Sequence, residues 1–377
     1  MTVTPPAGPE SPPVPPGAEG DSGGRHPVTL STTDGEALEF CCGSGQSVLE
    51  AAAEAGVTLP ASCRQGTCGS CHATATSGEY RLGAHSPQAL PPDERRDRGG
   101  VLLCRTFPRG PLTATLPYDG SRVLRGAIPV REGVITALEE VAEETVRLEV
   151  RLEPDPEEGP GCQFEPGQFV ELQPPGEEDV KRAYSLANTG NWDGLMEFFI
   201  RLRPGGRFSG HLRERARPGD PLVVRGPQGA FGLSETGLRP RWLVAGGTGL
   251  APMLAMARHM VEWQEPHPVR LVLGVNGEAD VFGLPELRAL AAEAAPVSGV
   301  PGLPGFEYDV CVWRPGAGWR GPVGTPADLV RAGLETEAAR PDVYVCGPPP
   351  LIDSVVEAAV EGGVPEGNVF RERFLPT

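Results

Sequence analysis

The stretch Ser62-Cys63-Arg64-Gln65-Gly66-Thr67-Cys68-Gly69-Ser70-Cys71 places three of the nine cysteines of this 377-residue chain in one short loop. The thiols follow the spacing C-x4-C-x2-C, and Cys104 follows further along the chain. In a reducing compartment, clustered cysteines indicate metal or redox chemistry rather than a disulfide framework. Gly66 and Gly69 supply the backbone freedom that a loop needs to fold closely around a bound group.

This spacing is typical of [2Fe-2S] sites held by four cysteine thiolates. A structural zinc site is the alternative, but such sites usually draw on two close C-x2-C pairs. Only Cys68 and Cys71 are paired in that way, which favours iron-sulfur over zinc. Without comparable partners, four other cysteines are expected to be small core residues: Cys41, Cys42, Cys162 and Cys311.

The composition of the chain excludes several classes of protein. The formal charge of −17 gives no reason to expect binding to nucleic acid or anionic lipid, and favours an acidic electron carrier or a basic protein partner. No apolar run reaches the roughly 18 residues of a membrane span, and the N-terminus lacks a signal-peptide pattern. We therefore expect a cytoplasmic protein with no membrane attachment. Residues 1–26, rich in Pro and Gly, are expected to form a disordered tail.

The rest of the chain divides into three expected domains, at 27–120, 121–238 and 239–377. The first begins with a hairpin, Val28–Ser31 and Ala37–Cys41, and a helix over Ser47–Ala55. Two further strands are expected at His72–Thr76 and Leu112–Leu116, and Asp119-Gly120 marks the boundary. This order and the motif at Ser62–Cys71 resemble the plant-type ferredoxin domain. The resemblance implies a β-grasp fold with four ligands of a [2Fe-2S] cluster, namely Cys63, Cys68, Cys71 and Cys104.

The second domain shows recurrent strand signals separated by Gly and Pro, a pattern that predicts a small antiparallel β-barrel. The expected strands are 133–138, 145–152, 168–172, 182–187, 196–201 and 221–225. The third domain alternates strands and helices, which predicts an α/β fold with a parallel sheet. Its expected strands are 242–245, 269–275, 308–313 and 343–346, and its expected helices are 251–263, 284–294, 326–334 and 351–360.

The barrel carries a motif suited to a flavin. In Arg182-Ala183-Tyr184-Ser185-Leu186-Ala187-Asn188, strand alternation puts Arg182 and Tyr184 on one face. Arginine can contact a phosphate, tyrosine can stack on a ring system, and the Ser185 hydroxyl can bond a ring nitrogen. An ordinary half-buried strand is the plain alternative. After the next strand, Pro204-Gly205-Gly206-Arg207-Phe208-Ser209 can present backbone N–H groups to a pyrophosphate.

Together these motifs resemble the FAD site of the ferredoxin-NADP reductase superfamily, and Gly226-Pro227-Gln228-Gly229 continues the match. The resemblance implies a specific set of FAD-binding residues: Arg182, Tyr184, Ser185, Asn188, Gly205, Gly206 and Ser209.

The third domain carries a candidate nucleotide loop between a strand and a helix, where a helix dipole attracts phosphate. Gly246-Gly247-Thr248-Gly249, with Pro252, is not a G-x-G-x-x-G fingerprint but is similar to the pyridine-nucleotide loop of the same superfamily. Cys346-Gly347-Pro348-Pro349 ends the late strand, where ligands gather in open α/β sheets. The resemblance places Cys346 near the nicotinamide, and a buried structural thiol is the alternative.

The segment Val275-Asn276-Gly277-Glu278-Ala279-Asp280 contains acids and no Arg or Lys. A carboxylate such as that of Glu278 can accept hydrogen bonds from ribose hydroxyls and repels a 2′-phosphate. The segment therefore favours NADH over NADPH.

The domain order resembles NADH-dependent reductase components of soluble methane monooxygenase, phenol hydroxylase and benzoate dioxygenase systems, over residues 27–377. The resemblance implies a monomer that passes electrons from NADH through FAD and [2Fe-2S] to an oxygenase component or its ferredoxin. Tyr184 and Ser185 would contact the flavin ring, and Thr248 and Cys346 would position the nicotinamide. Phe374 is expected to cover the flavin or to be a core aromatic. The rival hypothesis is a zinc-stabilised, nucleotide-binding regulatory module without redox activity.

Overall fold

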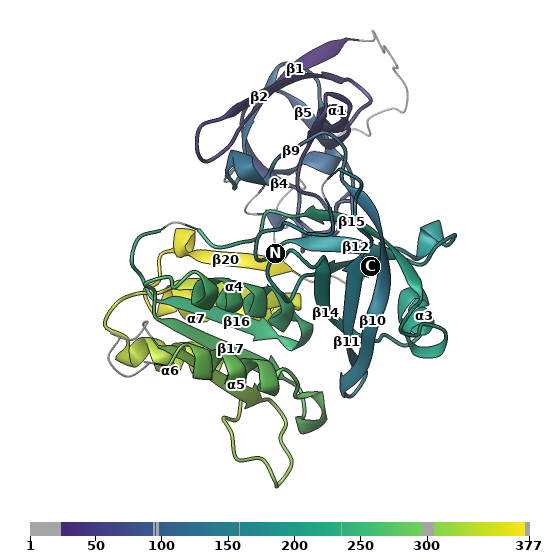
Figure 1. Cartoon of the computed structure of the whole chain (residues 1–377). Coiled ribbons are helices and arrows are strands. Elements are labelled where there is room, and N and C mark those ends of the chain that lie inside the picture. The colour runs from purple at the N-terminus through teal and green to yellow at the C-terminus, as the bar shows by residue number, and fades with distance from the viewer. Residues whose placement is uncertain are drawn as a thin grey trace, which may run out of the picture.

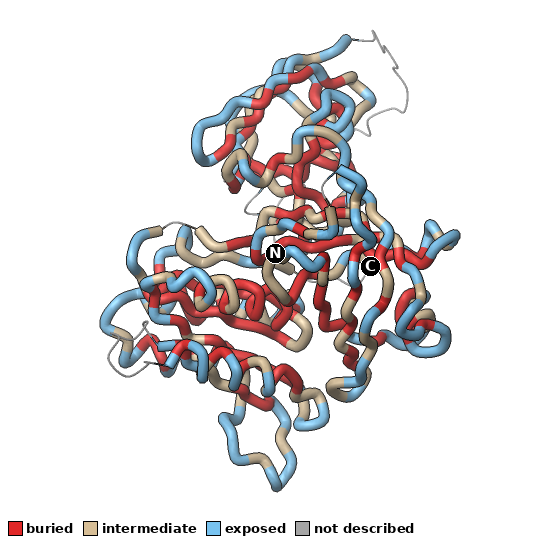
Figure 2. The backbone as a smooth tube through the Cα atoms, in the orientation of Figure 1, coloured by how far each residue is buried: buried red, intermediate tan, exposed pale blue. Residues whose placement is uncertain are grey.

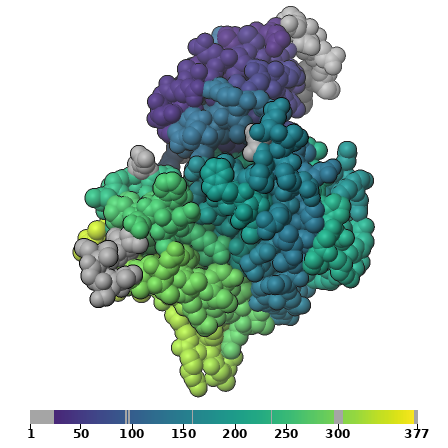
Figure 3. Space-filling model, viewed as in Figure 1, coloured from purple at the N-terminus to yellow at the C-terminus, as the bar shows by residue number. Residues whose placement is uncertain are grey.

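The computed structural model describes residues 24–92, 95, 98–157, 159–234, 236–295 and 305–373. Figure 1 shows three domains: the first lies above the other two, and the barrel and the α/β domain lie side by side below it. In the space-filling view of Figure 3 the first domain, in purple and blue, rests on the others as a distinct lobe. Among the described residues, no helix is both long and apolar enough to cross a membrane.

The first domain has a five-stranded sheet in the order β2-β1-β8-β4-β6, in which β1 and β8 are parallel and the other neighbours are antiparallel. A helix and two short strand pairs, β3 with β9 and β5 with β7, complete the expected β-grasp fold. The elements are β1 (Arg25–Ser31), β2 (Ala37–Gly43), α1 (Val48–Glu54), β3 (Val57–Thr58), β4 (His72–Ser77), β5 (Tyr80–Leu82), β6 (Gly100–Leu102), β7 (Thr106–Pro108), β8 (Leu112–Thr115) and β9 (Leu124–Arg125).

Local sequence accounts for the first elements of this domain. Gly35, with φ +88°, allows the tight turn between β1 and β2. Ser47 and Glu50 form a reciprocal capping box at the start of α1, so two otherwise unpaired backbone N–H groups are satisfied. The expected hairpin and helix are therefore present at nearly the expected positions.

Three features of this domain differ from expectation. Strand β1 already begins at Arg25, within the expected tail, because residues 25 and 26 pair with β2; residues 1–23 lie outside the described residues. Strand β9 pairs with β3, so the chain stays with the first domain beyond Asp119-Gly120. Cys41 is exposed and not a core residue, because neighbouring residues of a strand face opposite sides and Cys42 takes the buried side.

The second domain is an antiparallel six-stranded sheet in the order β13-β12-β15-β10-β11-β14, which curls into a barrel-like domain. The six expected strands are present, and α3 is an additional helix that directly follows the expected phosphate loop. The elements are β10 (Val130–Ala142), β11 (Thr145–Leu152), β12 (Phe169–Gln173), β13 (Arg182–Ser185), β14 (Leu195–Arg201), α3 (Arg207–Glu214) and β15 (Pro221–Gln228).

The third domain is a parallel sheet in the order β18-β17-β16-β19-β20, with helices on both faces. The four expected strands and four expected helices are present, and β20 is a fifth strand that the sequence pattern did not predict. The elements are β16 (Arg241–Gly246), α4 (Leu250–Glu262), β17 (Val269–Val275), α5 (Leu284–Glu293), β18 (Phe306–Val312), α6 (Pro326–Thr336), β19 (Asp342–Gly347), α7 (Pro349–Glu361) and β20 (Val369–Arg373).

Each domain has its own buried core, visible as red backbone within the sheets and helices in Figure 2. Polar contacts join the cores. Arg98 of the first domain makes a bidentate ion pair with Glu366, which precedes β20, at 2.9 and 3.0 Å. Arg373 of β20 donates to the backbone oxygen of Gln88. The first domain is therefore held above the β20 edge of the third.

A buried ion network joins the barrel to the third domain. Glu197 of β14 is only 5% exposed, and its two oxygens accept from Arg147 Nε at 3.0 Å and from Arg258 of α4 at 2.6 Å. Loss of one partner from a buried charge network leaves the remaining charges uncompensated.

We expect Glu197→Gln to lower the free energy of unfolding by about 3 kcal/mol, measured as a lower thermal midpoint. The matched control is Glu139→Gln, which alters a 61% exposed member of the same network at 3.7 Å from Arg147. That change should cost less than about 1 kcal/mol. Equal shifts in the two variants would contradict a role for burial.

Candidate functional site

The four predicted cluster cysteines come together as two pairs. Cys71 and Cys104 have their Sγ atoms 3.3 Å apart, and the backbone N–H of Cys63 donates to Cys68 Sγ at 3.5 Å. Within the described part of the chain, no three His, Cys, Asp or Glu side chains converge on a position for a single metal ion. Two thiol pairs fit two irons with two thiolates each better than they fit one tetrahedral zinc.

The loop also supplies hydrogen-bond donors to sulfur. The backbone N–H groups of Gln65 and Thr67 donate to Cys63 Sγ at 3.4 and 3.3 Å, and the Ser70 hydroxyl donates to Cys68 Sγ at 3.3 Å. The hydrogen bond between the two thiols lowers the pKa of Cys63 and raises that of Cys68, so Cys63 is the member of this pair that more readily forms the thiolate that binds iron. Such a loop can stabilise negative charge on several sulfurs at once.

Strand β13 presents the predicted flavin-contacting residues as expected from alternation. Arg182 and Tyr184 are half-buried on one face of the strand, while Ser185 is buried on the opposite face. The Tyr184 ring lies 5.4 Å from the ring of Phe208 in α3, and burial raises the pKa of its phenol. A neutral, partly open aromatic face next to a guanidinium suits a ring system that carries a phosphate tail.

The predicted phosphate loop leads into α3. Gly205 has φ +71°, and Gly206 is the N-cap of the helix with no side chain capping its first turn. Ser209 is buried in that turn, and its Oγ accepts from the backbone N–H of Arg203 at 2.9 Å. The helix start therefore offers backbone N–H groups and a favourable dipole to a phosphate.

Asn188 has a different environment from the other predicted FAD residues. Its Oδ1 accepts from the backbone N–H of Glu197 at 2.9 Å, and its Nδ2 donates to the Leu195 oxygen at 2.7 Å. These bonds tie the segment after β13 to β14, so the observed contacts of this amide hold the barrel together.

The two predicted nucleotide motifs lie side by side at the carboxyl edge of the parallel sheet. Gly246 ends β16, and Gly247–Gly249 form a 3-10 turn that continues into α4, with Pro252 buried in the first turns. A Cβ at Gly249 would lie 2.2 Å from the backbone oxygen of Cys346, so only glycine permits this contact.

On the β19 side of that edge, Gly347 has φ +155° and Pro348 is the N-cap of α7. The two loops thus form one surface at the sheet edge where dinucleotides bind in α/β folds.

Glu278 lies at the same edge, after β17. Its Oε1 accepts from the backbone N–H of Gly316 at 2.7 Å. The structure also brings Arg314 close: its backbone N–H donates to the Asn276 oxygen at 2.9 Å, and its guanidinium stacks 4.0 Å over the Trp313 ring. A basic residue is therefore near this edge, which the sequence segment 275–280 could not show.

No sequence motif indicates Glu372, a half-buried carboxyl of β20. Its Oε2 lies 3.9 Å from Cys346 Sγ, and it is hydrogen-bonded to the Ser185 side chain. Burial raises the pKa of Glu372 to about 8, and the two hydrogen bonds oppose that rise. Ser185 comes from the barrel and the other two residues from the third domain, so the three groups define the interface between the two domains.

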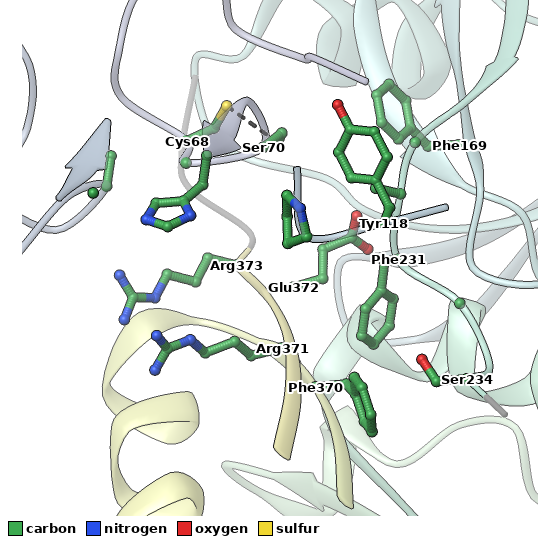
Figure 4. A pocket seen from close by; sticks show the side chains of 18 of the residues that line it. Cys68, Ser70, Tyr118, Phe169, Phe231, Ser234, Phe370, Arg371, Glu372 and Arg373 are labelled. Carbon is green, nitrogen blue, oxygen red and sulfur yellow. Dashed lines mark hydrogen bonds between the residues drawn. The ribbon is translucent and has the colours of Figure 1, made fainter. Parts of the chain in front are cut away.

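A cavity of about 450 Å³ extends from Glu372 to the cysteine loop (Figure 4). Cys68, Gly69 and Ser70 line one side, and Phe370–Arg373 line the other. Tyr118, which no sequence motif indicates, also lines the cavity, beside Phe169; its hydroxyl has no hydrogen-bond partner among the described residues, and burial raises its pKa. Phe374 lies outside the described residues, so its expected place over the flavin is not described.

Comparison with protein families agrees with this three-part arrangement. Residues 31–109 match the 2Fe-2S iron-sulfur cluster binding domain, residues 132–232 the oxidoreductase FAD-binding domain, and residues 243–357 the oxidoreductase NAD-binding domain. The fold and site thus define an iron-sulfur flavoprotein oxidoreductase that uses [2Fe-2S], FAD and NAD.

Individual relatives show which kind of iron-sulfur flavoprotein oxidoreductase this chain is similar to. Methane monooxygenase component C of Methylosinus trichosporium is 38% identical over 82% of this chain and 87% of its own length. The toluate 1,2-dioxygenase electron transfer component of Pseudomonas putida is 32% identical over 93% of this chain and 98% of its own. The crystal structure of an Amycolatopsis cytochrome P450 reductase shares 30% identity and a TM-score of 0.68, and covers 93% of this chain and 99% of its own.

The chain belongs to the family of electron-transfer reductase components of oxygenases. These matches favour a redox enzyme over the zinc-stabilised regulatory module.

The raised pKa of Glu372 predicts a pH dependence of stability. Its carboxyl ionises near 4.5 in an unfolded chain and near 8 in the folded one. The contribution of the protonated Glu372 carboxyl to the free energy of unfolding is therefore fully present below about pH 4.5 and is lost as pH rises to about 8. We expect Glu372→Gln to flatten the fall of the thermal midpoint between about pH 5 and pH 8. Parallel curves for wild type and variant would show that the carboxyl does not titrate there.

Proposed function

We propose that this protein oxidises NADH and delivers electrons one at a time to an oxygenase component or its ferredoxin. The observation that carries the proposal is the single cavity that reaches from Glu372, beside Ser185 and Cys346, to the cysteine loop. Bound FAD supplies hydride acceptance with single-electron release, and a [2Fe-2S] cluster supplies one-electron transfer. The protein supplies the relative positions of these groups.

The proposed cluster ligands are Cys63, Cys68, Cys71 and Cys104, whose paired arrangement fits two irons. In the barrel, Arg182 and the start of α3 with Gly205, Gly206 and Ser209 would hold the FAD phosphates, and Tyr184 would stack on its ring. In the third domain, Gly246–Gly249 and Pro252 would hold the nucleotide phosphates next to Gly347 and Pro348.

The flavin ring and the nicotinamide would be aligned against a wall formed by Ser185, Cys346 and Glu372. Because burial keeps Glu372 protonated near neutral pH, it can donate a hydrogen bond while Ser185 orients it. Thr248, half-buried between β16 and α4, would lie at the nicotinamide end of the same wall. The buried positions of Ser185 and Cys346 would limit the access of water to the place where hydride would move.

We further propose a monomer that acts in the cytoplasm, where cysteine ligands remain reduced. The relatives named for a monooxygenase and a dioxygenase support an oxygenase as the acceptor.

Loss of one cluster ligand should stop electron transfer through the cluster but leave the reduction of flavin by NADH intact. In Cys68→Ser, a hard oxygen replaces a thiolate, so we expect loss of the iron-sulfur absorption and of electron transfer to cytochrome c. NADH-dependent reduction of a dye that accepts directly from flavin should continue near the wild-type rate. The matched control is Cys41→Ser, an exposed thiol outside the loop, which should preserve all three signals. Undiminished cytochrome c reduction by Cys68→Ser would contradict the proposed electron exit.

Nucleotide choice provides a second test. We expect kcat/KM for NADH to exceed that for NADPH at least tenfold, which corresponds to about 1.4 kcal/mol, because Glu278 repels a 2′-phosphate. Glu278→Gln keeps the acceptor for Gly316 but removes the charge, so this ratio should fall. Equal use of both nucleotides by the wild type would show that Arg314 rather than Glu278 governs the site.

A further inference from the structure

The overall charge conceals an uneven distribution. The sequence from residue 24 to 126 contains ten Arg and ten Asp or Glu, so the first domain is formally neutral in a chain of charge −17. The excess acid therefore belongs to the rest of the chain. A neutral domain can still present a charged face if its arginines gather in one place.

Three arginines gather at the cysteine loop. Arg64 lies within the loop and is exposed, and Arg105 directly follows Cys104. A Cβ at Gly66 would lie 2.7 Å from Arg105 Cγ, so the Arg105 side chain packs on the loop. The guanidinium carbons of Arg81 and Arg105 lie 4.1 and 5.9 Å from the centre of the half-buried Phe107 ring.

These arginines lack acidic partners. Across the described residues, none of the three forms an ion pair within 4.0 Å. Several other arginines, in contrast, form ion pairs with Glu or Asp side chains of the barrel. The nearby carboxylate is Glu50, whose pKa both Arg64 and Arg105 help to lower. Its oxygen already accepts from the N–H and hydroxyl of Ser47. Positive charge at the loop is therefore only partly offset.

The loop has two faces. Gly69 and Ser70 line the cavity next to β20, whereas Arg64, Gln65 and Thr67 are exposed and do not line it. Exposed Gln65 and Thr67 are also the residues whose N–H groups contact Cys63 Sγ. The arginines thus lie next to the exposed part of the loop that contacts Cys63 Sγ, while Cys68, Gly69 and Ser70 face the cavity.

We propose that Arg64, Arg81, Arg105 and Phe107 form the docking surface for the electron acceptor, and that this surface binds an acidic face of the partner protein. The inference rests on the proposed function, in which electrons leave through the cysteine loop. Arginine and aromatic residues are enriched at the energetic centres of interfaces. Stacking on Phe107 orders the guanidinium groups before binding, and their unpaired charge steers an acidic partner. The net charge of the chain alone favours an acidic electron carrier or a basic partner and does not indicate this surface.

Two forms of one acceptor test this surface. Native cytochrome c is basic and succinylated cytochrome c is acidic, although both carry the same haem. With the full-length holoenzyme, we expect the second-order rate for the acidic form to fall as salt rises. Arg81→Glu should slow the acidic form at least fivefold at low salt and should not slow the basic form. Arg64→Glu should behave in the same way.

The matched control is Arg25→Glu, the same charge change at an exposed position of β1 in the same domain, which should leave both rates unchanged. If Arg81→Glu and Arg25→Glu have equal effects, the docking surface lies elsewhere. If Arg81→Glu slows both forms equally and lowers the reduction potential of the cluster, the arginine tunes the cluster and the inference is wrong. Failure of NADH to reduce flavin and cluster in the wild type would instead reject the proposed function.

Discussion

Pairing of β20 with β19 is the constraint on which the functional arrangement depends. This short strand, Val369–Arg373, completes the parallel sheet and presents successive residues to different neighbours. Glu372 reaches Cys346 at the domain interface, while Arg373 bonds to Gln88 of the first domain. The same strand forms a wall of the cavity that faces the cysteine loop (Figure 4). One edge strand therefore contributes to both the proposed hydride site and the position of the iron-sulfur domain.

The parts of the site that are local in sequence could be predicted from it. Three of the four paired thiols lie within Ser62–Cys71, so their spacing alone indicates the chemistry. Likewise, alternation along β13 correctly puts Arg182 and Tyr184 on one face. In each case the backbone geometry follows from residues a few positions apart.

The parts that depend on distant pairing could not be predicted. Glu372 has no motif of its own; its role comes from β19 pairing and from contact with Ser185 of another domain. Arg314 similarly reaches the edge near Glu278 only because β18 lies beside β17. Net charge has a similar limit, since it says nothing about where charges gather on the surface.

The docked position of the first domain implies that electrons cross within the molecule without domain movement. Anaerobic rapid mixing of the full-length holoenzyme with NADH, in buffers of increasing viscosity, tests this directly by following reduction of the cluster after that of the flavin. Because the cysteine loop and Glu372 line the same cavity, the rate of cluster reduction should be independent of viscosity and of enzyme concentration. A rate that falls in proportion to viscosity would show that the domains must move before the electron crosses, and would contradict the central role of the docked arrangement.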